Sequence, residues 1–137
     1  MIGEGGRYLP VLYDLERPYW EAASMGVLVL PWCSRCGRHW LPAGPLCPNC
    51  LSRDYQWKVA SGHGILEGHV VIHRAPAPWY KARLPYVVAQ MRLAEGPRLL
   101  GNIIGPMPQR IADGLPLMVA FEKVTDLITL VQFKFDS

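Results

Sequence analysis

The residues best suited to chemistry in this chain are its four cysteines, which all lie between positions 33 and 50. They form two Cys-x-x-Cys pairs, Cys33 with Cys36 and Cys47 with Cys50, separated by ten residues. Two residues between thiolates let one tight turn aim both sulfur atoms at a single point, so two such turns predict a tetrahedral site. Four sulfur ligands favour a structural zinc ion held by bonds of about 2.3 Å, with no open position for catalysis.

Other interpretations of the cysteines fit the rest of the chain less well. Two disulfides would require an exported protein, and the first residues show no basic-then-apolar export signal. A single redox-active pair would leave the other pair without a role, whereas iron is an alternative that four thiolates also accept. Gly37 suits the positive φ of the first turn, but Leu51 follows Cys50. The second turn is therefore expected to be less typical.

Length and composition indicate a small protein built mainly from β-strands. A chain of 137 residues makes one ordinary domain or two very small units. Thirteen prolines and thirteen glycines suit short strands joined by turns. No apolar run approaches the roughly 20 residues that cross a bilayer. We therefore expect a cytoplasmic protein without a membrane segment.

The net charge of +3 conceals an uneven distribution of basic residues. Positions 31–98 carry nine arginines and lysines against three acidic residues, and ten of the fourteen basic residues of the chain are arginine. Arginine is well suited to bidentate contacts with phosphate or carboxylate groups. The bias is either an ordinary solvated surface or a sign of an anionic partner: a phosphorylated cofactor, nucleic acid or an acidic protein face.

Around the cysteines, the sequence predicts a helix and a small ribbon. The helix is expected to begin at Asp14 as N-cap and to end at Gly26, with an apolar stripe that must pack on another element. Residues 27–30 are predicted to form a strand, 40–42 its return strand, and 55–59 a strand that leaves the ribbon.

After position 63 the pattern is all β. Five strands are predicted, at 65–73, 86–93, 98–104, 117–123 and 130–135. Short strands punctuated by glycine and proline predict a closed barrel of the OB type. The fold class is thus mainly β, with a helix and zinc ribbon in residues 1–62 and a five-stranded OB-fold barrel in 63–137.

The connection between the first two barrel strands, residues 73–85, is unlike the other turns. It is long, stiffened by prolines, and carries Trp79 and Tyr80 between basic residues. Tryptophan and tyrosine are enriched at binding hot spots, and prolines lower the entropic cost of ordering a loop on a partner. The alternative is a loop whose Trp79 folds back to plug the mouth of the barrel.

No catalytic constellation is evident in the sequence. There is no Gly-rich phosphate loop, no paired-carboxylate motif, no Gly-x-Ser-x-Gly turn and no His-Glu-x-x-His. His69 and His73 are expected on one face of a strand, with His63 nearby, but no carboxylate is clearly partnered to them. Surface histidines are favoured over a second metal or an acid/base role, and we expect no catalytic residue in this chain.

A series of short motifs runs in order along residues 17–135. The first motif runs from Pro18 to Gly26 and leads into residues 28–30, and the second consists of the four cysteines with Gly37. The remaining motifs are the segments 41–42, 60–64, 73–74, 85–89, 95–98 and 121–126. In this order they resemble the DUF35 family, whose members carry a rubredoxin-like zinc ribbon before an OB-fold. The resemblance departs at Leu51, where a small residue is usual.

The resemblance implies an accessory subunit of acyl-CoA metabolism. DUF35 proteins bind thiolase-superfamily enzymes, and some are paired with or fused to MaoC-like hydratases, while the catalytic residues belong to the partner. For this chain, it implies a non-catalytic zinc-binding subunit of an acyl-CoA thiolase, acyltransferase or retro-aldolase complex. Two copies are expected to flank a thiolase-like dimer, with a coenzyme A thioester as a ligand shared with the partner.

On this hypothesis the loop after the first barrel strand binds the partner. The expected partner-binding residues are Trp79, Tyr80, Pro85 and Tyr86. The cations expected to face partner carboxylates or CoA phosphates are Arg74, Lys81 and Arg83.

The alternative function is a nucleic-acid-binding module, because OB-folds and zinc ribbons both occur in that role. Single-strand binding needs aromatic side chains on the second and third barrel strands for base stacking. Here those strands offer Tyr86 and otherwise aliphatic or small residues. We therefore expect no nucleic-acid partner.

Overall fold

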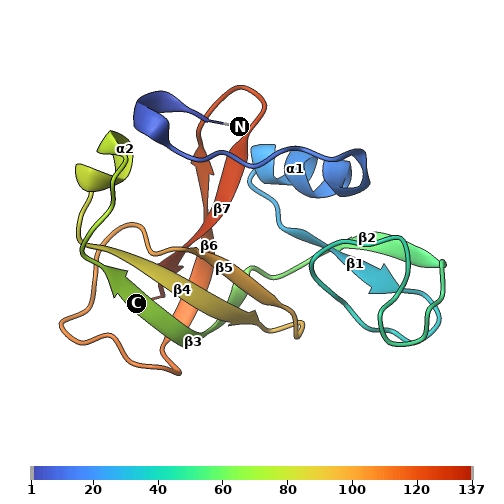
Figure 1. The fold of residues 1–137 in the computed structure, drawn as a ribbon. Helices are drawn as coiled ribbons and strands as arrows, with labels where there is room; N and C mark the ends of the chain where they lie inside the picture. The colour runs from blue at the N-terminus through green and yellow to red at the C-terminus, as the bar shows by residue number, and fades with distance from the viewer. Residues whose placement is uncertain (1, 137) are drawn as a thin grey trace.

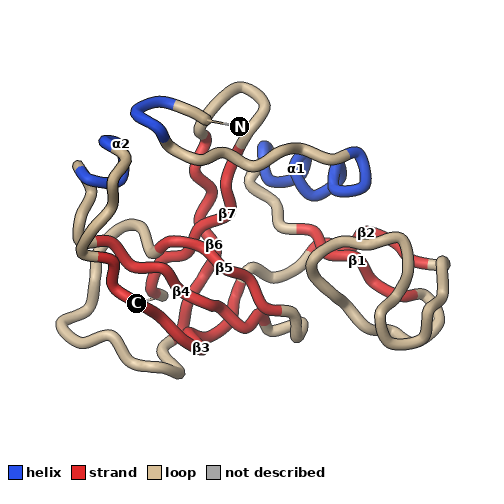
Figure 2. The backbone as a smooth tube through the Cα atoms, in the orientation of Figure 1, coloured by secondary structure: helices blue, strands red, loops and turns tan. Residues whose placement is uncertain are grey.

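The structure, a computed structural model, describes residues 2–136, which form an N-terminal arm with a short helix, a two-stranded ribbon and a five-stranded barrel (Figure 1). The ribbon lies to one side of the barrel, and α1 lies above their junction (Figure 2). None of the helices in this part of the chain has the length and apolar character needed to cross a membrane. The elements are η1 (Glu4–Gly6), η2 (Asp14–Glu16), α1 (Arg17–Ser24), β1 (Val29–Cys33), β2 (Tyr55–Val59), β3 (His63–Ile72), α2 (Pro78–Lys81), β4 (Tyr86–Leu93), β5 (Arg98–Asn102), β6 (Pro116–Lys123) and β7 (Thr129–Phe135).

The barrel is an antiparallel sheet with the strand order β5-β4-β3-β6-β7. A parallel bridge between Ile103 and Phe133 brings the two edges of the sheet together, so the barrel is nearly closed. A bulge in β3 between Leu66 and Gly68 shifts its register against β4. Bulges increase local twist, which a small barrel needs in order to curl. This arrangement confirms the predicted OB-fold.

One hydrophobic core joins the barrel to the helix and the base of the ribbon. Buried and less buried residues alternate along β4, as expected for a strand with one face toward the core. The barrel contributes Leu66, Leu117 and Phe133, all fully buried. Ala23 of α1 and Leu30 of β1 belong to the same cluster. Packing against the barrel therefore holds the helix and the ribbon base in place.

The N-terminal helix begins later than predicted, and Asp14 is not its N-cap. Asp14 lies in η2, and no side chain caps either η2 or α1. Its carboxylate instead accepts a 2.6 Å hydrogen bond from the Arg17 guanidinium. Glu16 holds the N-cap position of α1, and Pro18 in the first turn favours the helix start. Gly26 follows the helix with φ 73°, as predicted.

The return strand predicted at 40–42 is wrong. Strand β1 pairs with β2 instead, with Val29 opposite Val59 and Cys33 opposite Tyr55. Trp40 is buried beside the cysteines, and its N–H donates to the Pro31 carbonyl at 3.3 Å, but the pairing with β1 extends no further than an isolated bridge between His39 and Trp32. The apolar residues at 40–42 therefore reflect burial in a loop and not a strand.

The barrel strands agree closely with the predicted ones. Strand β4 has the predicted bounds, and the ends of the other four differ by at most two residues. The differences lie at strand ends, where pairing with a neighbour decides how far the strand continues.

The barrel core gives a first testable prediction. Leu66→Ala removes a fully buried side chain and should lower the free energy of unfolding by about 2–5 kcal/mol. The control Leu100→Ala, in the same barrel but 70% exposed, should change it by less than about 0.5 kcal/mol. Urea unfolding of the metal-loaded protein measures both, and equal losses would contradict this description of the core.

Candidate zinc centre and partner-binding surface

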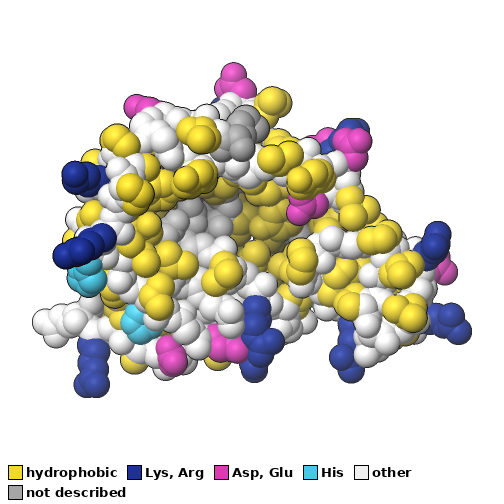
Figure 3. Space-filling view, viewed as in Figure 1, with side chains coloured by type: hydrophobic (Ala, Val, Ile, Leu, Met, Phe, Trp, Pro, Cys, Tyr) yellow, Lys and Arg dark blue, Asp and Glu magenta, His cyan; other side chains and the backbone are white. Residues whose placement is uncertain are grey.

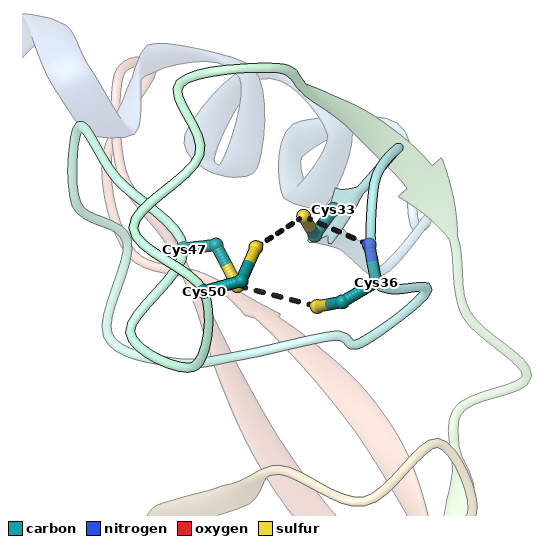
Figure 4. A group of neighbouring side chains, drawn as sticks. All are labelled: Cys33, Cys36, Cys47 and Cys50. Atoms are coloured by element: carbon teal, nitrogen blue, oxygen red, sulfur yellow. Dashed lines mark hydrogen bonds between the residues drawn. The ribbon is translucent and has the colours of Figure 1, made fainter.

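The four cysteine side chains come from two turns and point toward a common centre (Figure 4). Their sulfur atoms all lie within 4.8 Å of one another. The Sγ atoms of Cys33 and Cys50 are 3.5 Å apart, as are those of Cys36 and Cys47. Bonds of about 2.3 Å to one tetrahedral ion would place the sulfur atoms roughly 3.8 Å apart, close to these spacings. The cysteines are therefore positioned to bind a structural zinc ion.

Backbone N–H groups favour the thiolate form of two of the ligands, Cys33 and Cys36. The amide N–H of Cys36 donates to Cys33 Sγ at 3.4 Å and lowers the pKa of that thiol. A hydrogen bond from the backbone N–H of Arg38 lowers the pKa of Cys36 to about 6. Metal binding requires deprotonated sulfur, so these amides prepare the site for a cation.

The ribbon has very little core besides its cysteines. Its cluster consists of Cys33, Trp40 and Cys47, with Cys50 and Tyr55 packed against it. The rings of Trp40 and Tyr55 meet edge to face, with centroids 5.3 Å apart. So small a cluster is not sufficient to hold the two cysteine turns together, and a bound metal ion would supply the missing stabilisation.

The two metal-binding turns share one backbone conformation. The N–H of Gly37 donates to the carbonyl of Cys33, and that of Leu51 to Cys47, each at 2.8 Å. Gly37 has φ 77° and Leu51 has φ 63°, both in the left-handed region. The second turn thus repeats the first despite its leucine, which is the only non-glycine residue with positive φ within residues 2–136.

The four residues predicted to bind a partner gather around one cavity of about 570 Å³ (Trp79, Tyr80, Pro85 and Tyr86). Trp79 and Tyr80 lie on α2, and the Tyr80 ring lies 5.9 Å from that of Tyr86. The N-terminal arm forms another wall, and this face of the molecule is hollowed below the arm and α1 (Figure 3). The loop is therefore ordered against the arm, with Trp79 beside residues at one end of the barrel.

The three predicted cations do not act as one group. Arg83 lines the cavity, and its guanidinium lies 3.7 Å from the Trp79 ring centroid. Arg74 and Lys81 lie instead along a separate shallow hollow beside His73. The basic residues of the loop are thus divided between the cavity and the separate hollow.

Sequence reasoning missed two residues of this surface, Arg7 and Tyr8. The Arg7 guanidinium lies 3.9 Å from the Trp79 ring centroid, and the Tyr8 N–H donates to Tyr80 Oη at 3.1 Å. The arm shows no periodicity, and its contacts reach more than 70 residues along the chain. No local signal in the sequence could have indicated them.

A partly buried polar network lies at the base of the cavity. Arg7 donates to Glu122 Oε1 at 3.0 Å, and Gln132 Nε2 donates to the same oxygen at 3.1 Å. Gln132 Oε1 in turn accepts from the Asn102 N–H at 2.7 Å. Burial opposes ionisation of Glu122, but the hydrogen bonds from Arg7 and Gln132 hold its pKa below the usual value. Arg7 is thereby paired although it is buried.

The histidines singled out in the sequence do not form a site. His63 Nδ1 lies 3.6 Å from Asp136, and His69 Nδ1 lies 3.8 Å from Asp113. Among the described residues, the cysteines form the group with metal-binding geometry, and no histidine is part of it.

Comparison with known proteins identifies the two halves of the chain. Residues 20–56 match the family model of the ChsH2 rubredoxin-like zinc ribbon domain, and residues 57–122 match that of the ChsH2 C-terminal OB-fold domain. A DUF35 domain-containing scaffold protein of Methanothermobacter thermautotrophicus is 32% identical over 95 residues, covering 69% of this chain and 71% of that protein. The chain belongs to the DUF35 family.

Two further relatives show how a DUF35 chain occurs in other proteins. A probable enoyl-CoA hydratase alpha subunit of Thermomonospora curvata is 35% identical over 120 residues, and this DUF35 chain spans only 37% of its length. A solved structure named Ltp2-ChsH2(DUF35) aldolase is 33% identical, with a TM-score of 0.81 over 93% of this chain and 98% of that one.

The zinc centre gives a second prediction. Cys33→Ser should abolish metal binding and unfold the ribbon, because three thiolates do not complete the site. Wild-type protein should contain about one zinc ion per chain by atomic absorption. As a control, Ser34→Ala, which changes the exposed residue next to Cys33, should leave the zinc content at the wild-type value. A red, iron-containing wild-type protein would contradict the assignment to zinc.

The strained turn gives a third prediction. Leu51→Gly should raise the free energy of unfolding by about 0.5–1 kcal/mol, because relief of the left-handed strain exceeds the entropic cost of glycine. Leu51 is 69% exposed, so little packing is lost. Leu127→Gly, at an exposed loop position without positive φ, should instead lower stability. Urea unfolding of the zinc-loaded proteins compares them, and a loss for Leu51→Gly would contradict the strain.

Proposed function

We propose that this chain is a non-catalytic, zinc-containing subunit of an enzyme complex that acts on an acyl-CoA thioester. One observation carries the proposal: the similarity, over nearly its whole length, to the chain of the Ltp2-ChsH2(DUF35) aldolase structure. That name joins a DUF35 component to a second component and to an aldolase. The hydratase alpha subunit among the relatives also links such a chain to CoA thioesters.

In this proposal the partner is a thiolase-superfamily protein that supplies the catalytic residues. The resemblance of the sequence motifs to DUF35 proteins supports this partner, in a complex of two copies of each chain. A MaoC-like hydratase is a second partner, which the hydratase alpha subunit supports.

The surface around α2 is the proposed contact with the thiolase-like partner. Trp79, Tyr80 and Tyr86 are half-buried aromatic residues, and Pro85 beside them is exposed. Aromatic side chains already held in position lose little entropy on binding, so they make efficient anchors.

The division of the cations supports two roles for them. Arg83 lines the cavity beside the aromatic residues, where a phosphate of a shared CoA ligand could reach it. Arg74 and Lys81, in the separate hollow, are placed to meet carboxylates of the partner.

Co-expression with a candidate thiolase-superfamily partner tests the proposal, which predicts a stable heteromer in size-exclusion chromatography. Trp79→Ala should weaken the complex at least tenfold, since aromatic hot spots contribute about 2 kcal/mol or more. Trp32→Ala is the matched control, because Trp32 is likewise covered by a cation, Lys58, but lies on the ribbon. A partner that is fully active alone and forms no complex would overturn the proposal.

A further inference from the structure

The N-terminal arm and the loop 73–85 are held together by a ring between two cations. Arg7 and Arg83 both lie within 4 Å of the Trp79 ring centroid, at 3.9 and 3.7 Å. Two guanidinium groups this close to one centroid cannot share a face, so they cover opposite faces of the indole. The arm backbone also lies close to the backbone of Trp79, since a side chain at Gly5 would come within 3.1 Å of Trp79 Cβ and 3.2 Å of its backbone nitrogen.

The two guanidinium groups differ in how they are fixed. Arg83 is exposed and donates to the Trp79 carbonyl within its own loop. Arg7 is buried, with 8% of its surface exposed, and is bound to Glu122 on β6. Arg7 thus connects the loop to the rigid barrel, whereas Arg83 moves with the loop.

The Glu122 carboxylate makes this arrangement of like charges possible. Two cations on one ring repel each other, and an indole alone does not neutralise them. Glu122 accepts from Arg7 directly and is also under the electrostatic influence of Arg83. The barrel therefore supplies the negative charge that lets Arg7 approach Trp79.

We propose that Arg7 is the positioning residue of the loop 73–85, holding Trp79 and Tyr80 in the orientation that binds a protein partner. This role rests on the proposed function, which assigns partner binding to that loop. The hydrogen bond from the Tyr8 N–H to Tyr80 Oη continues the same attachment one residue further along the arm.

The proposal predicts that a change in the arm loosens a segment some 70 residues away. In Arg7→Ala, amide hydrogen exchange in residues 73–85 should rise at least tenfold, because the loop loses the ion-paired side chain that connects Trp79 to Glu122 of the barrel. Exchange in β4, directly after the loop, should not change. Arg7→Lys keeps the charge but not the planar group that covers the ring, so it should give an intermediate rise.

Partner affinity distinguishes positioning from a general structural role. Arg7→Ala should bind the co-expressed thiolase-like protein at least tenfold more weakly, with an unchanged zinc content and an unchanged exchange rate in the barrel strands. Arg17→Ala is the matched control, because Arg17 is another arginine of the N-terminal segment, forms an exposed ion pair with Asp14, and should leave both properties at wild-type values.

Each outcome decides a different part of the argument. Wild-type exchange of the loop in Arg7→Ala, or a loosened loop with wild-type partner affinity, would overturn the positioning role. Absence of any binding by the wild-type chain would overturn the proposed function and the binding half of this proposal. The exchange comparison would in that case still show whether Arg7 holds the loop.

Discussion

The convergence of four thiolates on one point is the constraint on which the N-terminal half of the molecule depends. The ribbon buries only a small cluster around Cys33, Trp40 and Cys47, and so little apolar surface cannot offset the entropy of ordering the chain from Cys33 to Cys50. A metal ion supplies what the core lacks. Strand β1 ends at Cys33 and carries Leu30 into the barrel core, so order at the metal is transmitted directly to the barrel.

A second constraint acts at the other end of the barrel, where the arm meets the loop. The ion pair from Arg7 to Glu122 spans 115 residues of sequence and places a cation over Trp79. An aromatic loop that is already ordered can bind a partner at a lower entropic cost than a free one. The metal site and Arg7 thus have similar roles. The metal site orders the weakly packed ribbon beside the OB-fold, and Arg7 of the arm attaches the loop 73–85 to it.

Prediction from sequence succeeded where the signal was local. Spacing alone identified the cysteines, and alternation along 86–93 defined β4 because one face of that strand is buried. It failed for Asp14, whose carboxylate had an equally local alternative partner in Arg17. It also failed for Trp40, since burial in a loop and burial in a strand select the same apolar residues.

By itself, the sequence determined the zinc ligands and the five barrel strands, because both depend on residue types and spacing over short stretches of the chain. It also determined the DUF35 family, because short motifs follow one another in the family's order along residues 17–135. Only the tertiary structure decided that Trp79 lies between Arg7 and Arg83, and that Arg74 and Lys81 belong to another surface. It also showed that Leu51 adopts the conformation of a glycine. The physical reason is the same in each case: packing and charge pairing between distant segments have no counterpart in local sequence pattern.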